Sequence, residues 1–294
     1  MASTQEFRRR IKSVNNTKQI TKAMEMVASV KMQKAIRGIQ NARSYVQNSW
    51  NIFAKLVHMS LPGDHPLLKS NDSRKAAVIF ITSDRGLCGA FNADMAKKIN
   101  KFVKEECADC DIIAVGKKGA DFVRNYQVGN LTAVFPGFEN NIELEDVIPI
   151  SKLTNGEYLA GKYSRVYIVY SHFVSSLKQT PAVKQILPIN QQHIDLPELW
   201  EQHDESVEKI EFKFEPNADQ ILEKLLLRML RLQILGAVLE SNASEHSARM
   251  IAMKNATDNA EDLISDLTLT YNAIRQDSIT REIAEISGAA EAMK

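Results

Sequence analysis

Apolar residues between positions 217 and 294 recur in alternating steps of four and three, which is typical of the seam of a supercoiled helix. The segment contains no proline, and only His246 and Thr257 place polar atoms in the seam. One helix of this length would extend for about 110 Å, so it needs a partner helix alongside it. The seam positions are Leu225, Met229, Leu232, Gly236, Leu239, Ala243, His246, Met250, Met253, Thr257, Ala260, Ile264, Leu267, Tyr271 and Ile274.

Residues 1–61 form a second proline-free segment with a seam of the same kind. Small residues recur at every seventh position along it, at Ala28, Ala35, Ala42 and Ser49, so two backbones can approach closely. We predict that segments 1–61 and 217–294 pair as a long antiparallel coiled coil, the C-terminal helix projecting by about 25 Å. The N-terminal seam is expected to shift by one residue after Val14: Phe7, Ile11, Val14, then Ile20, Met24, Val27, then Met32, Ala35, Ile39, Ala42, Val46 and Phe53.

Between these segments, residues 62–216 contain all eight prolines and alternate between apolar strands and helical stretches. This alternation predicts an α/β fold with a Rossmann-like, mostly parallel sheet. A further strand is expected around Ile210, Phe212 and Phe214. The predicted domains are therefore 1–61, 62–216 and 217–294. The predicted strands are Ala76–Thr82, Asp111–Val115, Leu131–Phe135, Arg165–Phe173 and a candidate at Val183–Ile189. Three helices are predicted: one that ends near Glu106, one over Lys117–Tyr126 and one around Leu144–Leu153.

The charge is distributed unevenly, although the whole chain carries only +1. Residues 1–61 contain eleven Lys and Arg against two acids, whereas residues 217–294 contain eight against twelve. The first segment therefore keeps positive charge for an acidic partner even when it pairs with the last. The most apolar run, 225–239, is interrupted by Arg228 and Arg231 and is too short to span a bilayer. Together with only three cysteines, these features indicate a cytosolic protein.

Three features of the middle segment could carry chemistry, and a structural interpretation is favoured for each. Cys107 and Cys110 have the spacing of a metal or redox pair, but two thiolates cannot complete a tetrahedral site. Gly116–Gly119 follows a strand and opens a helix, yet it lacks the glycine spacing of a phosphate loop. The loop Ser83–Gly89 has no neighbouring histidine to act as a base, and we expect it to hold the sheet against the helices. We therefore expect no catalytic, cofactor-binding or metal-binding residue.

Four motifs resemble the gamma subunit of F-type ATP synthases, in the order in which that family carries them. They are residues 10–28 (RIKSVNNTKQITKAMEMVA), 83–89 (SDRGLCG), 244–259 (SEHSARMIAMKNATDN) and 279–290 (ITREIAEISGAA). The resemblance implies a central rotor shaft without catalytic residues of its own, which couples proton flow through the c-ring to ATP synthesis on beta subunits. The implied partners are alpha, beta, epsilon and the c-ring, with no nucleic acid and no small-molecule substrate. The implied location is peripheral, on the cytoplasmic face of the bacterial inner membrane.

The same resemblance identifies residues that would contact the catalytic subunits or support the shaft. Met24 matches a shaft methionine that faces the beta subunit, and neighbouring cations on the N-terminal helix belong to the same surface. For each position, solvated helix surface or seam packing is the alternative. The full set is Arg9, Lys22, Met24, Arg249, Arg275, Gln276 and Thr280.

Two other classes of function remain open from the residues alone. A basic coiled coil could bind nucleic acid through Arg8–Arg10 and Lys12, and salt-dependent DNA binding would favour that alternative. An α/β enzyme with helical dimerisation arms would hydrolyse a substrate such as ATP without partners. Against the first, no aromatic residues are interleaved with the charges; against the second, no pocket chemistry is recognisable.

Overall fold

The structure, a computed structural model, describes residues 4–59, 65–107, 109–138, 142–189 and 218–292. The chain divides into two compact units, a helical unit (Met1–Ala28 and Arg249–Lys294) and a sheet unit (Ser29–Ala248). Two long helices run through both. The elements in chain order are α1 (Thr4–Met59), the short 3-10 helix η1 (Pro66–Leu68), β1 (Ala76–Ile81), α2 (Phe91–Glu106), β2 (Cys110–Val115), α3 (Lys117–Tyr126), β3 (Asn130–Phe135), α4 (Ile148–Leu159), β4 (Arg165–Phe173), β5 (Gln179–Leu187) and α5 (Ala218–Ala292).

The sheet unit contains one five-stranded sheet in the order β3-β2-β1-β4-β5. The first four strands are parallel and β5 pairs antiparallel with β4, which confirms the predicted mostly parallel α/β fold. β5 begins earlier than predicted and includes Pro181, which an edge strand tolerates because one side of its backbone has no ladder partner. The strand expected around Ile210, Phe212 and Phe214 lies outside the described residues.

The helix predicted around Leu144–Leu153 instead covers Ile148–Leu159. Pro149 explains the difference, because proline fits only the first turn of a helix, where its missing N–H is not needed. The helix therefore starts just before Pro149.

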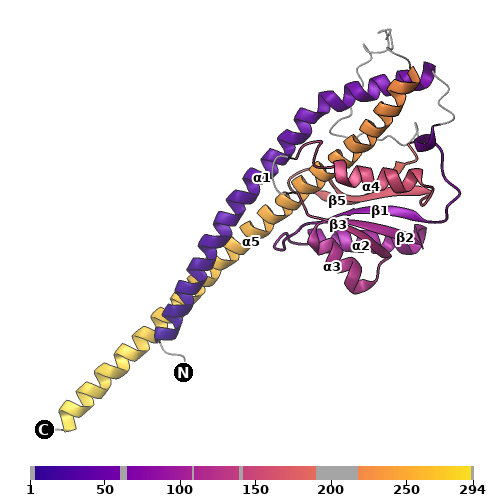
Figure 1. Ribbon diagram of the computed structural model, residues 1–294. Helices are drawn as coiled ribbons and strands as arrows, with labels where there is room; N and C mark the ends of the chain where they lie inside the picture. Colours follow the sequence, from indigo (N-terminus) through magenta and orange to yellow (C-terminus); the bar gives the residue numbers. More distant parts are fainter. Residues whose placement is uncertain (1–3, 60–64, 108, 139–141, 190–217, 293–294) are drawn as a thin grey trace. The chain divides into compact units, whose positions relative to one another are not determined.

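Helices cover both faces of the sheet (Figure 1). β1 is buried on both sides, and its residues alternate between two apolar cores. Ala77, Ile79 and Ile81 face a core formed with α4, α5 and the part of α1 that belongs to this unit. Ala76, Val78 and Phe80 face a second core formed with α2 and α3. This burial from two sides explains why the strand is an uninterrupted apolar run.

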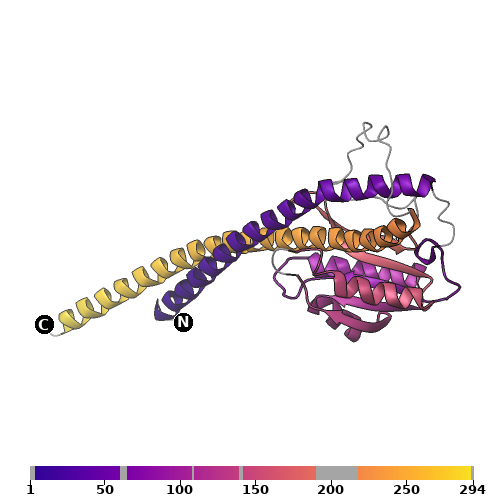
Figure 2. The ribbon, with the colours of Figure 1, turned by 45° about the horizontal axis from the view of Figure 1, so that its top comes forward.

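Within the sheet unit, α1 and α5 pack closely through small residues. Gly38 lies so near α5 that a Cβ at this position would be 3.2 Å from Cδ2 of Leu239. Ala35 and Ser49 are buried on the same side of α1, as the seven-residue spacing of small side chains predicted. α5 lies in one layer between α1 and the sheet (Figure 2), so nearly every residue from 229 to 244 is buried.

In the helical unit the two helices run antiparallel. The hydroxyls of Thr21 and Thr257 share a hydrogen bond of 2.8 Å, and Nζ of Lys18 lies 3.0 Å from Oε1 of Glu261. The α5 side of this seam matches the prediction. Its buried and half-buried positions are Met253, Thr257, Ala260, Ile264, Leu267, Tyr271 and Ile274.

The α1 side of the seam corrects the prediction, because the expected one-residue shift does not occur. Ile20 and Val27 are 61% and 57% exposed, whereas Ala28 is 1% exposed. The steps of three and four continue from Val14 through Lys18 and Thr21 to Ala28. The helix keeps its register there because Lys18 and Thr21 find polar partners on α5, so the two polar side chains are tolerated in the seam.

Candidate partner-contact surface

Among the residues of the helical unit that the structure describes, the end of α5 has no partner helix. The contacts of Lys18 with Glu261 and of Thr21 with Thr257 set the register, which brings the first turn of α1 level with residues near 274. The following residues to 292, hereafter the α5 overhang, continue for about 27 Å. This agrees with the projection expected from the segment lengths.

The overhang carries an apolar stripe that nothing in the described chain covers. Ile279, Ile283 and Ile286 follow one another in steps of four and three and are 43%, 59% and 70% exposed. Such a stripe on a helix surface indicates contact with another protein or a membrane. None of the described helices is long and apolar enough to cross a bilayer.

The first part of α1 presents a different surface, in which cations and apolar side chains alternate. Six cations and two acids lie between Thr4 and Ala28, and two of the cations are engaged by those acids. Arg10 contacts Glu6 at 2.5 Å, and Lys22 lies 3.1 Å from Glu25. Exposed Ile20, Met26 and Val27 lie on the same helix. A surface of this composition suits a partner that offers carboxylates beside apolar residues.

All seven residues predicted as contacts lie in the helical unit, but they do not form a single cluster. Lys22 and half-buried Met24 lie one turn from the Thr21–Thr257 contact, and exposed Arg9 lies nearer the N-terminus. Arg275, Gln276 and Thr280 are exposed on the overhang, where the Thr280 hydroxyl donates to the Gln276 carbonyl at 2.9 Å. Arg249 is half-buried at the start of the α5 part of this unit. By this register Lys22 and Arg275 are about 30 Å apart along the helices, and Arg9 lies between them.

Sequence reasoning missed two groups of exposed apolar residues. Ile20 and Val27 were assigned to the seam, although an unbroken repeat through Lys18 and Thr21 would have left them on the surface. The stripe of Ile279, Ile283 and Ile286 has heptad spacing but is offset by one residue from the seam that ends at Ile274 and Ser278. That offset was the available signal for a second apolar face.

The turn at Gly116–Gly119, considered above as a phosphate site, is occupied by side chains of the chain itself. The amide of Lys117 donates to Oδ1 of Asp84 at 2.9 Å, and the amide of Gly119 donates to Oγ1 of Thr82 at 2.8 Å. Asp84 also accepts a 3.1 Å bond from the amide of Gly137 through Oδ2. The loop residue Asp84 therefore ties together neighbouring loops at the carboxyl end of the sheet, and it explains the turn without a ligand.

Cys107 and Cys110 are buried and unbridged. Their mutual hydrogen bond lowers the pKa of the Cys107 thiol and raises that of Cys110, and burial raises the pKa of Cys110 further. Among the residues that the structure describes, no group of three or more His, Cys, Asp or Glu side chains could hold a metal ion. Both side chains pack within the second apolar core.

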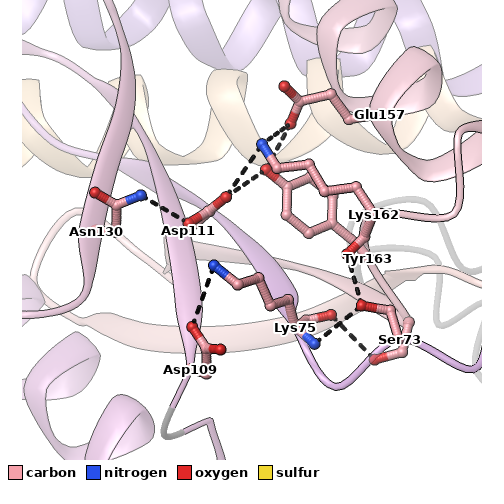
Figure 3. Close-up of polar contacts among 9 residues, drawn as sticks. Ser73, Lys75, Asp109, Asp111, Asn130, Glu157, Lys162 and Tyr163 are labelled. Atoms are coloured by element: carbon pink, nitrogen blue, oxygen red, sulfur yellow. Dashed lines mark hydrogen bonds and ion pairs between the residues drawn. The ribbon is translucent and has the colours of Figure 1, made fainter.

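A polar cluster lies at the opposite, amino end of the strands (Figure 3). Buried Asp111 accepts hydrogen bonds from Asn130 and Tyr163, both at 2.9 Å, and lies 3.2 Å from Nζ of Lys162. Burial raises the pKa of the Asp111 carboxyl, but these contacts outweigh it and the pKa is lowered overall. Lys162 also pairs with Glu157 at 3.1 Å. The cluster joins β2, β3, α4 and the start of β4, a structural role.

Comparisons with known proteins cover nearly the whole chain. A family model described as ATP synthase matches residues 3–293. The ATP synthase gamma chain of Pelotomaculum thermopropionicum is 40% identical over 100% of both chains, and that of Dehalococcoides mccartyi strain CBDB1 is 38% identical over 100% of both. Among solved structures, a chain of the Euglena gracilis mitochondrial ATP synthase (OSCP/F1/c-ring) aligns with a TM-score of 0.66 at 22% identity, covering 99% of this chain and 94% of that one. A chain from the central stalk and c-ring of the Tetrahymena thermophila enzyme gives 0.58 at 21% identity, covering 81% and 99%. These structures support the fold.

Proposed function

The chain belongs to the ATP synthase gamma chain family, the rotor of the central stalk, and we propose that it couples proton flow through a membrane ring to ATP synthesis on other subunits. In this mechanism the chain makes and breaks no bond of ATP. It acts by turning, and it presents a different contact surface to each of the subunits around its axis.

The α5 overhang is the observation that supports this proposal best. It is a single helix with exposed apolar residues on one side, and none of the described residues covers them, so we propose that other subunits surround it. A shaft of this kind lacks threefold symmetry, and three identical sites around it are therefore contacted differently. Each site is shifted towards a different conformation, and rotation exchanges the three.

The proposed partners follow the two kinds of surface. The alpha and beta subunits form the ring around the helical unit, and the cationic and apolar face of α1 contacts acidic segments of beta. The sheet unit is proposed to bind the epsilon subunit and the c-ring. The division into 1–61, 62–216 and 217–294 stays a proposal, and its first and last segments each contribute to both units. The assembly holds the chain peripherally on the cytoplasmic face of a bacterial inner membrane.

The seven predicted residues become proposed coupling contacts. Met24, Lys22 and Arg9 belong to the first part of α1, and Arg275, Gln276 and Thr280 to the overhang. Arg249 supports the shaft where the helical unit begins on α5. The chain is proposed to be non-catalytic, with the chemistry on beta. The family assignment leaves the nucleic-acid alternative without support.

Met24→Lys in the assembled complex tests the coupling role. The variant adds a cation at a half-buried interface position, and we expect ATP-driven proton pumping into inverted vesicles to fall more than ATP hydrolysis or copurification of alpha, beta and epsilon. Met24→Gln, of similar length without charge, is the control and should retain coupling. Equal loss of pumping and assembly, or equal loss in both variants, would refute the assignment.

A further inference from the structure

Within the sheet unit, α5 carries a short run of buried polar residues in an otherwise apolar helix. Glu240, Ser244 and Ser247 are fully buried at 0% exposure. Their spacing of four and three residues places them on one face of the helix. Burying polar side chains is costly unless they are bonded, and an apolar face would have been the more stable choice for packing alone.

Each of these side chains bonds to the end of β4 or to the hairpin that follows it. Oε2 of Glu240 lies 2.6 Å from Nδ1 of His172 and accepts a 3.4 Å bond from the amide of Phe173. The Ser244 hydroxyl donates to the carbonyl of Ser171 at 3.2 Å. The Ser247 hydroxyl donates to the carbonyl of Ser176 at 2.5 Å. These three residues of α5 are hereafter the polar patch.

Two more contacts reinforce the same connection. The side chain of Gln179, at the start of β5, donates to the Ser247 hydroxyl at 3.3 Å. On another side of the helix, Nδ2 of the Asn242 side chain donates to the carbonyl of Phe138 at 2.8 Å. Polar bonds therefore hold two turns of α5 to the sheet and to the loop after β3.

The geometry of the polar patch restrains a motion that apolar packing does not. Hydrophobic contact resists separation of two surfaces but has no preferred direction along them. Hydrogen bonds require both a short distance and an aligned donor, so they fail when one partner turns or slides. Turning α5 by one residue, about 100°, would carry all three side chains away from β4. The patch thus fixes the angle of α5 about its own axis.

Resting on the proposed rotary function, we propose that the polar patch is the torque-bearing contact of this subunit, through which the sheet and α5 turn as one body. It adjoins Ala248, where the sheet unit ends along α5. Burial raises the pKa of the Glu240 carboxyl, and the neighbouring His172 ring opposes that effect. The Glu240 carboxylate in this contact is fully buried, whereas the His172 side chain is 19% exposed.

The double variant Ser244→Ala/Ser247→Ala tests the proposal in the complete ATP synthase complex. The alpha–beta ring is immobilised, and a rotation probe is attached to the sheet unit through Lys101→Cys on the exposed side of α2. During ATP hydrolysis, the variance of the probe angle at each pause reports torsional stiffness. We expect that variance to increase at least about twofold, because two of the three side chains of the polar patch lose their directional bonds. Proton pumping against a gradient should fall while hydrolysis continues.

Ser151→Ala/Thr154→Val is the matched control. These two hydroxyls are equally buried and have the same spacing, but they donate to carbonyls of α4 itself, those of Ile148 and Ile150. Their removal breaks no hydrogen bond between two elements, so the variance of the probe angle should match that of the wild type. An equal increase in the control would mean general loosening and would overturn the proposal.

The remaining outcomes separate this proposal from the rotary function itself. Wild-type variance in the double variant overturns the torque-bearing role while leaving the rotary function intact. A wild-type complex that hydrolyses ATP without turning the probe overturns the rotary function. If the double variant does not assemble, the single variants Ser244→Ala and Ser247→Ala should each increase the variance of the probe angle. Wild-type variance in both single variants would also overturn the torque-bearing role.

Discussion

Val27 and Ala28 are neighbours on α1, yet the structure gives them opposite environments. Val27 is 57% exposed and Ala28 is 1% exposed. Replacing each by Gln puts the same side chain at adjacent positions of one helix. Ala28→Gln forces a longer side chain into a filled site, which costs about 1–3 kcal/mol, and buries an amide without a partner, which costs about 1–3 kcal/mol more. Val27→Gln adds a solvated side chain and should change the free energy of unfolding by no more than about 0.5 kcal/mol.

Urea titration of the purified full chain, followed by circular dichroism at 222 nm, measures the difference. We expect Ala28→Gln to lose several times more stability than Val27→Gln, since helix propensities differ by only a few tenths of a kcal/mol. A seam shifted by one residue, as the apolar residues alone suggested, predicts the reverse order. Equal losses, or a larger loss for Val27→Gln, would refute the register of the helical unit.

Three further predictions concern other parts of the molecule. Ile283→Lys should leave the unfolding free energy within about 0.5 kcal/mol but reduce copurification of alpha and beta, whereas Glu285→Lys on the opposite side of the helix should not; equal retention of both would argue against contact by the stripe. Asp111→Asn should cost about 1–3 kcal/mol at pH 7. The pKa of Asp111 is lowered in the folded state, so its contribution to the free energy of unfolding is complete above the unfolded pKa of about 3.9 and disappears as pH falls through the folded pKa. In urea titrations from pH 5 to pH 2, the free energy of unfolding should therefore decline less steeply for the variant than for the wild type. Parallel curves would contradict this. Gly116→Ala should cost about 2 kcal/mol or more, because φ is +97° and the new Cβ would lie 2.2 Å from the Thr82 carbonyl oxygen. Gly288→Ala, with nothing within 4 Å, should not destabilise the protein in thermal melts, because alanine is the better helix former.

Most of the architecture could be predicted because it depends on local periodicity. A single clear period is found in the helix Lys117–Tyr126, in the two proline-free helical segments and in the strand Arg165–Phe173. The difficult stretch was α1 between Val14 and Ala28. The apolar residue Ile20 stands next to the polar seam position Thr21, and choosing by hydrophobicity alone gives the wrong face. The seam residues Lys18 and Thr21 are identifiable only through their partners on α5.

The polar contacts of the sheet unit show the limit of prediction more sharply. Asp111 and Tyr163 are 52 residues apart, and Glu240 and His172 are 68 apart. Nothing in the periodicity of either segment indicates which of many carboxylates is buried, because the answer depends on how the strands and α5 come together. The signal that remained in the sequence was compositional: the run from Glu240 to Ser247 is polar for a segment that must lie in the middle of an apolar helix.

The polar positions of α5 have a common physical logic in each unit. An apolar seam with a seven-residue repeat is nearly satisfied again when one helix slides by seven residues, so hydrophobic packing alone specifies register weakly. The Thr21–Thr257 hydrogen bond and the Lys18–Glu261 ion pair can form in only one of those registers. Polar residues in the seam of a coiled coil specify its register in this way. In the sheet unit, the polar patch fixes the angle of α5 on β4 in the same way. A subunit that transmits rotation needs a defined helix angle and a defined register more than it needs maximal stability. An apolar side chain at the polar seam positions or in the polar patch would have stabilised the fold without defining the angle or the register.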